Sequence, residues 1–156
     1  MSNGELKAIL RHGETEVEFS GDYEDVWRSI NKYLSEIYPS IEAVKRLTGA
    51  IDVDLLMKKL EGLVEIREGM ISVLEDAGAK RKILLCLAGA YVGKILGFLE
   101  RDRLTPKEIA SYTGLNEKVT RARLSELRRA GLVVRYGEGL YGFTKASIRE
   151  LFGEEL

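Results

Sequence analysis

The sequence predicts a mainly helical α+β fold that is built in two parts. Residues 1–78 show short strand patterns interleaved with short helical ones. Residues 79–100 form a helical segment that is apolar almost all round. After it, two short amphipathic helix patterns are followed by a hairpin pattern. We therefore expect a small α+β unit in residues 1–78 and a second domain in residues 79–156.

The composition is that of a globular protein, with 156 residues, 45% of them hydrophobic, and a formal net charge of −1. The longest apolar run, 83–92, is far shorter than the roughly 20 residues of a membrane-spanning helix. The residues after Met1 do not have the pattern of a secretory signal. One Cys and one His exclude an internal disulfide and a zinc site built from Cys and His. We expect a cytoplasmic protein without a metal or cofactor, and the absence of Gln beside many charged residues is typical of thermophiles.

The first unit begins with a predicted hairpin. Three glutamates alternate with less polar side chains in residues 14–20, a period of two that is typical of a strand with one buried face. The run 5–10 and a turn at His12-Gly13 supply the other strand. Residues 22–37 then carry apolar side chains at helical spacing. We expect this helix to stop at Tyr38-Pro39, because the residue before a proline avoids the α region.

Two shorter helices and a second hairpin complete the predicted first unit. The helices are expected at 41–47 and 54–61. The hairpin pairs 63–66 with 70–74 around a turn at Glu68-Gly69. This half of the chain is a candidate for dimerisation or for binding an effector.

The long helix expected at 79–100 has glycines at every fourth position. Gly89, Gly93 and Gly97 therefore share one face. Each costs about 1 kcal/mol relative to Ala inside a helix, so three in register indicate that another segment approaches closely. That segment belongs either to the same monomer or to a second copy. Cys86, in the apolar middle of this helix, is interpreted as a small core residue.

Two short helices with clear start signals follow the long one. Thr105 and Glu108 have the spacing of a capping box, and Pro106 stands at the first helical position. Asn116 is placed to cap a second helix that runs to Ala130.

A predicted hairpin and a last helix end the chain. Strands at 132–136 and 140–144 flank the turn Gly137-Glu138-Gly139, and a helix is expected from Lys145 to Phe152. Helix, short turn, helix and hairpin in this order are the pattern of a helix-turn-helix with a wing.

Several short motifs occur in fixed order within this segment. They are Glu108-Ile109-Ala110, Thr113-Gly114-Leu115, Leu124 with Leu127, and Gly131-Leu132-Val133. With the glycine-containing hairpin that leads to Thr144, they resemble the winged helix-turn-helix domains of archaeal and bacterial transcription regulators of the MarR and ArsR type. The resemblance implies a homodimer that binds double-stranded DNA with helix 116–130 in the major groove. A small-molecule effector is compatible with it.

Basic charge is concentrated in this region. Residues 101–135 contain nine Lys and Arg against four acidic residues, whereas residues 1–100 have a net charge of −4. The outward face of helix 116–130 is basic or small. We predict that four side chains read base edges: Lys118, Arg121, Ala122 and Ser125. Five are predicted phosphate contacts: Thr105, Lys107, Arg128, Arg129 and Arg135.

Two alternatives stay open at this point. Arginines on an exposed helix are often only solvated. The acidic first part and Glu138 at the hairpin tip favour a protein-interaction module of a nucleic-acid-processing assembly that does not itself read DNA. No catalytic set emerges, since His12 lies at a predicted turn and the sequence places no Ser or Cys near it, and we do not expect an enzyme.

Overall fold

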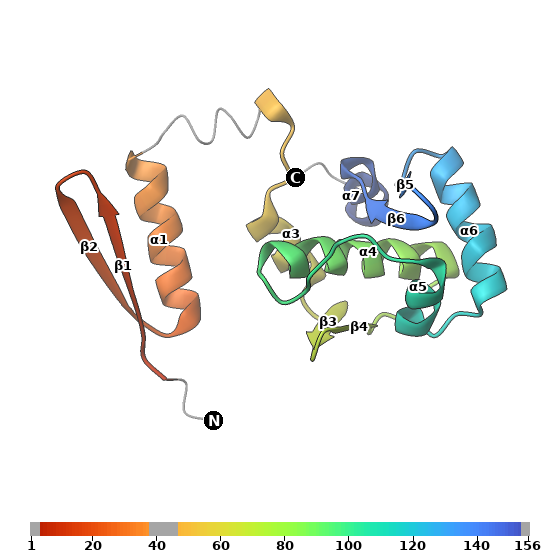
Figure 1. The fold of residues 1–156 in the computed structure, drawn as a ribbon, viewed down its shortest axis with the longest axis horizontal. Helices are drawn as coiled ribbons and strands as arrows, with labels where there is room; N and C mark the ends of the chain where they lie inside the picture. Colours follow the sequence, from red (N-terminus) through yellow and green to blue (C-terminus); the bar gives the residue numbers. More distant parts are fainter. Residues whose placement is uncertain (1–3, 38–46, 154–156) are drawn as a thin grey trace. The chain divides into compact units, whose positions relative to one another are not determined.

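The computed structural model describes residues 4–37 and 47–153 and has an α+β fold (Figure 1). The chain divides into two compact units, Met1–Ala50 and Ile51–Leu156. The expected boundary at 78/79 does not coincide with this division.

The boundary lies at 50/51 rather than at 78/79 because residues 51–78 pack against the long central helix. Leu56, Leu60 and Ile71 precede residue 79, yet they belong to the same buried cluster as that helix. A helix that is apolar all round must be covered on every side. Residues 51–78 supply part of that cover and so belong to the C-terminal unit.

The N-terminal unit consists of a hairpin and one helix. β1 (Leu6–His12) pairs antiparallel with β2 (Thr15–Gly21), which confirms the predicted hairpin. Gly13 has φ +60° at the first position of the two-residue turn, as a type II′ turn requires. α1 (Tyr23–Ile37) follows as predicted. The stop expected at Tyr38-Pro39 and residues 41–46 of the next predicted helix lie outside the described residues.

The C-terminal unit contains nine described elements. They are α3 (Val53–Leu60), β3 (Val64–Arg67), β4 (Met70–Val73), α4 (Ala79–Ile95), α5 (Pro106–Thr113), α6 (Glu117–Arg129), β5 (Val133–Tyr136), β6 (Leu140–Phe143) and α7 (Lys145–Phe152). β3 pairs with β4 and β5 with β6, each pair antiparallel. The predicted second and third hairpins are therefore confirmed.

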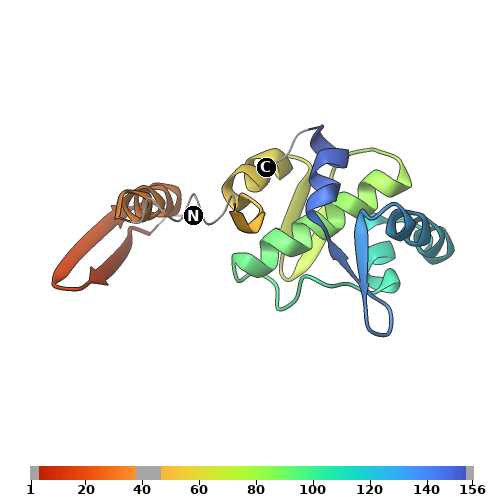
Figure 2. The ribbon, with the colours of Figure 1, turned by 90° about the horizontal axis from the view of Figure 1, so that it is seen from above.

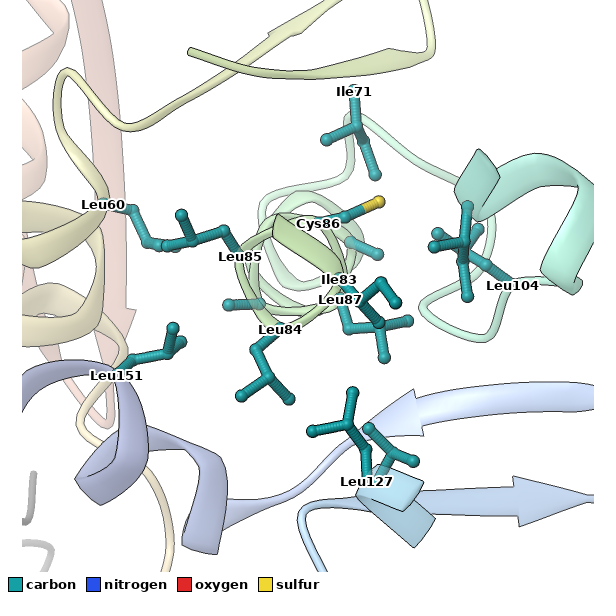
Figure 3. Close-up of a cluster of buried hydrophobic side chains, with 14 of the residues drawn as sticks. Leu60, Ile71, Ile83, Leu84, Leu85, Cys86, Leu87, Leu104, Leu127 and Leu151 are labelled. Carbon is teal, nitrogen blue, oxygen red and sulfur yellow. The ribbon is translucent and has the colours of Figure 1, made fainter. Parts of the chain in front are cut away.

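α4 is the centre of this unit. In Figure 1 the β3–β4 hairpin lies on one side of it and β6 and α7 lie on the other, while α6 stands at the edge of the unit in this view and in Figure 2. Figure 3 looks along α4 and shows apolar side chains from several elements around it, among them Ile71, Leu127 and Leu151. Burial on all sides explains why the sequence of α4 has no polar stripe.

α4 is shorter than predicted. It ends at Ile95 rather than at residue 100. Gly97 has φ +80° just beyond the end, where a left-handed residue commonly terminates a helix. Gly97 therefore ends the helix instead of continuing the glycine face, which corrects the expectation of three glycines in register.

The two remaining glycines pack within the monomer. A Cβ atom added at Gly89 would lie 2.7 Å from Cγ1 of Val64. One added at Gly93 would lie 2.6 Å from Cδ1 of Leu99 and 2.9 Å from Cδ1 of Ile66. β3 and the segment after α4 thus approach this face closely, and they account for both glycines.

We expect Cys86 to resist alkylation in the folded protein at pH 8. Its side chain is fully buried, and this burial, with a smaller effect of the negative charge of Glu108, raises the pKa of the thiol to about 12. Only the thiolate reacts, so labelling requires unfolding. Mass spectrometry after iodoacetamide treatment, with and without guanidinium, measures this. Labelling of the native protein as fast as the unfolded one would contradict the buried position.

Candidate nucleic-acid interface

The α5–α6 corner is fixed by two caps. The hydroxyl oxygen of Thr105 accepts a hydrogen bond from the backbone N–H of Glu108 at 3.2 Å, and the Glu108 carboxylate accepts one from the N–H of Thr105 at 2.8 Å. This confirms the capping box. α5 ends at Gly114 with φ +73°, and Asn116 caps α6 by accepting from the N–H of Lys118 at 2.7 Å. The turn between the two helices is therefore set by local residues.

α6 has one buried side and one exposed side. Thr120 and Leu124 have no exposed surface and Leu127 has 2%, as the helical spacing predicts. The hydroxyl of Thr120 donates to the carbonyl of Asn116 at 2.9 Å. Six side chains of the other side are all exposed and form what we call the exposed α6 face: Lys118, Arg121, Ala122, Ser125, Arg128 and Arg129. The structure thus brings all four predicted base-reading residues together.

Arg121 is not a free cation in this structure. Its Nη2 atom lies 2.8 Å from Oε1 of Glu117, one turn earlier on the same helix. Sequence reasoning missed this pair, although a Glu four residues before an Arg is the favourable orientation on a helix. The two side chains are 60% and 47% exposed, so the ion pair is worth little and can be exchanged for another partner.

Arg123 belongs to the packed side of α6. Its Nη1 atom donates to Oε1 of Glu126 at 2.6 Å, and Nζ of Lys80 lies 2.9 Å from the other carboxylate oxygen. The hydrogen bonds from Lys80 and Arg123 lower the pKa of Glu126. This cluster connects α6 to α4, and it leaves Arg123 outside the exposed α6 face.

The N-terminus of α5 is already occupied by a carboxylate. The side chain of Glu108 lies against the N–H of Thr105 and also pairs with Arg101. The hydroxyl of Thr105 donates to the same carboxylate at 3.3 Å, so it is engaged within the cap. Lys107 is exposed beside it. Of the two predicted phosphate contacts here, Lys107 is therefore the better placed.

The β5–β6 hairpin is held against the start of α5. Leu104 and Tyr141 form an antiparallel bridge, with N–O distances of 2.9 and 2.8 Å between their backbones. At the far end of the hairpin, the hydroxyl of Thr144 donates to the carbonyl of Leu132 at 2.8 Å. The tip residue Glu138 is exposed, as is the predicted phosphate contact Arg135.

A cation beside the tip of the β5–β6 hairpin was not predicted from the sequence. The guanidinium of Arg103 stacks 3.5 Å from the ring centroid of Tyr136. Gly142 makes room for this ring, because a Cβ atom there would lie 2.8 Å from Cε2 of Tyr136. No spacing rule connects residues 103 and 136, since the contact depends on how the hairpin folds back onto the segment before α5.

Several cations of this region are available to a partner. Within residues 101–135, all of which the structure describes, only Arg101, Arg121 and Arg123 form ion pairs, and six cations form none: Arg103, Lys107, Lys118, Arg128, Arg129 and Arg135. Arg129 donates only to the backbone carbonyl of Ser125, at 3.4 Å. Such side chains can contact phosphate without first breaking a salt bridge.

Within residues 4–37 and 47–153, no helix combines the length and apolarity needed to cross a membrane. The same residues contain no group of three or more His, Cys, Asp or Glu side chains that could hold a metal ion.

The chain was compared with protein-family models, with curated proteins and with solved structures, and none of the three comparisons finds a match.

Proposed function

We propose that the chain is a DNA-binding transcription regulator whose C-terminal unit is a winged helix-turn-helix domain. The observation that carries this proposal is the exposed α6 face, which combines four basic residues with small Ala122 and Ser125. On the opposite side of the same helix, Leu124 and Leu127 are buried in the core. The order α5, α6, β5, β6 supports the assignment, because this is the order of a helix-turn-helix followed by a wing.

The proposed roles follow from side-chain chemistry and position along α6. Lys118 and Arg121 lie in its N-terminal half, which usually meets base edges, and both can donate to the acceptors of guanine. Ser125 can bond several bases, while Ala122 leaves room for a close approach to the groove. Four cations around them would contact phosphates: Lys107, Arg128, Arg129 and Arg135.

Recognition through a single α6 helix would bury little surface, and most regulators of this architecture bind two half-sites. We therefore propose a homodimer on double-stranded DNA. Its two α6 helices would lie about 34 Å apart, the spacing of adjacent half-sites on one face of the duplex.

A protein-interaction module is the alternative, and two observations favour it. Glu117 neutralises Arg121 at 2.8 Å, and the hairpin tip presents Glu138, where a wing that enters the minor groove would present a cation. A module of this kind would use the same exposed α6 face for an acidic protein partner.

Titration of random-sequence duplex DNA tests the proposal directly. With about four phosphate contacts per subunit, log K should fall with log salt concentration with a slope of about −3 to −4 per subunit. The double variant Arg128→Ala/Arg129→Ala should reduce that slope by roughly two. Fluorescence anisotropy at several salt concentrations measures both. If micromolar protein does not bind the duplex DNA at low salt, the protein-interaction module is the correct alternative.

Replacing Glu117 by Gln should tighten DNA binding several-fold. The change releases Arg121 from its ion pair and removes a negative charge from the start of α6. Glu150→Gln, at an exposed position of α7, is the matched control, because it changes the net charge equally and lies outside the exposed α6 face. Anisotropy titrations at one low salt concentration compare the three proteins. Equal affinities for wild type and Glu117→Gln would mean that Arg121 does not meet DNA.

A further inference from the structure

The N-terminal unit has a core that is only half closed. In its described residues, 4–37 and 47–50, Val26 is the one hydrophobic side chain that is fully buried, with 2% exposure. Tyr23, on the amphipathic helix α1, remains 54% exposed. The inner face of the hairpin is half-buried and consists of Ala8, Leu10, Val17 and Phe19. A core of this size supplies little net stability by itself.

Small units of this kind are usually supported by disulfides, by a structural metal or by association. The chain has one Cys and one His, which leaves no internal disulfide and no zinc site built from these residues. Association with another surface is the remaining common support, and the edges of the hairpin are where a strand can be added.

Acidic side chains on β2 disfavour pairing of this strand with β2 of a second copy. Among the described residues the sheet has two strands, so each strand has one open edge. Consider two β2 strands that pair antiparallel about a twofold axis with their apolar faces on the same side. In a register centred on Val17, Glu16 faces Glu18 of the second copy. In a register centred on Glu18, Glu18 faces Glu18 of the second copy. In a register centred on Phe19, Glu16 faces Asp22 of the second copy. Each register opposes like charges, which is destabilising.

The β1 edge accepts a second copy without such repulsion. In the register centred on Ala8, Lys7 faces Ile9 of the second copy, and Arg11 faces Glu5, an opposite charge. A register centred on Ile9 is disfavoured, because Lys7 would then face Arg11. Within the hairpin, Lys7 pairs with Glu18 at 2.9 Å and Arg11 with Glu16 at 2.5 Å, and these ion pairs reduce the charge of both edges alike.

The backbone of β1 is oriented for this pairing. In a hairpin closed by a two-residue turn, the flanking residues His12 and Thr15 form a hydrogen-bonded pair, and bonded and non-bonded pairs then alternate. Ile9 and Glu18, three pairs further on, therefore form a non-bonded pair. The N–H and C=O groups of Ile9 point away from β2 and toward the open edge.

We propose that two copies of this chain join along their β1 strands into one four-stranded antiparallel sheet, in the order β2-β1-β1-β2, with both α1 helices on one face. Leu6 and Ile9, which are 40% and 56% exposed in the single chain, would lie at the new seam. Leu6 would face Leu10 of the second copy on the side that the helices cover. This surface is the dimer contact that the proposed function calls for, but it is argued from the N-terminal unit alone.

Matched proline variants of the full chain test the seam. Sedimentation of about 50 μM wild-type protein should give twice the 17.5 kDa mass of the chain. Ile9→Pro removes an N–H that the hairpin does not use, so it should weaken the dimer at least tenfold while the circular dichroism spectrum is kept. Glu18→Pro makes the same change at the paired position on β2 and should remain dimeric. A monomeric wild type, or an Ile9→Pro variant that dimerises like the wild type, would overturn the proposal.

Hydrogen exchange of the wild-type protein locates the dimer seam without any substitution, so it tests the proposal even if a proline variant unfolds. The amides of Lys7, Ile9 and Arg11 should exchange slowly at high protein concentration and faster on dilution, whereas those of Glu16 and Glu18 should exchange fast at both. Protection of β2 instead, or no dependence on concentration, would refute a β1 seam. A monomer that binds DNA would remove this inference and the proposed homodimer but leave DNA binding in place, whereas a β1-joined dimer without DNA binding would remove the proposed function alone.

Discussion

Replacing Leu124 by alanine should lower the free energy of unfolding by about 2–5 kcal/mol, the range for a leucine truncated inside a packed core. Leu124 has no exposed surface and belongs to the cluster that surrounds α4. Whole domains are stable by only about 5–15 kcal/mol, so a large share of the stability would be lost. The proposed DNA binding should then be lost at elevated temperature together with the fold.

Chemical denaturation followed by circular dichroism measures this loss. Val119→Ala is the matched control, since it removes methyl groups from the same helix at a position that is 40% exposed. Its cost should stay within about 0.5 kcal/mol. A cost below 1 kcal/mol for Leu124→Ala would mean that α6 is not held by the core as the structure describes.

The region around α5 and α6 was well predicted because its signals are local. Thr105 with Glu108, and Asn116 at the next helix start, fix helix ends within a few residues of the chain. The spacing of Thr120, Leu124 and Leu127 then decides which side of α6 is buried. The composition of the exposed α6 face follows from this without any long-range information.

What the sequence did not predict depends on long-range packing. The cover that Leu56 and Ile71 give to α4 moves the boundary between the units, and the stacking of Arg103 on Tyr136 depends on the fold of the hairpin. The early end of α4 at Gly97 is different, because a glycine that ends a helix looks like a glycine inside one when neighbouring glycines share its spacing. Periodicity alone could not separate the two.

The unequal distribution of charge along the chain affects how selective the proposed DNA binding can be. The chain as a whole has a net charge of −1, and residues 1–100 have one of −4. In the proposed function, the basic stretch 101–135, where the exposed α6 face lies, would supply most of the attraction for nucleic acid. An acidic remainder would oppose indiscriminate coating of DNA, so in the proposed complex affinity would come from a few side chains that fit one site.

Arg121→Ala should consequently weaken binding to a preferred DNA sequence by about 1–3 kcal/mol, which is roughly 5- to 150-fold. The preferred sequence is first obtained by selection from a random duplex pool, and affinities for it and for random DNA are then measured side by side. Arg123→Ala is the matched control, because that guanidinium is bound to Glu126 on the packed side of α6. It should change DNA affinity less than twofold.

The comparison of specific and random DNA decides what Arg121 does. A guanidinium that reads guanine loses affinity only for the selected sequence, whereas one that meets a phosphate loses it equally on every sequence. In the proposed complex Arg121 would have to leave Glu117, so breaking the 2.8 Å ion pair would reduce its net contribution to binding. In the Glu117→Gln background the loss caused by Arg121→Ala should therefore be larger than in the wild type. Equal losses in both backgrounds would show that the two side chains act independently, and no loss in either would remove Arg121 from the interface.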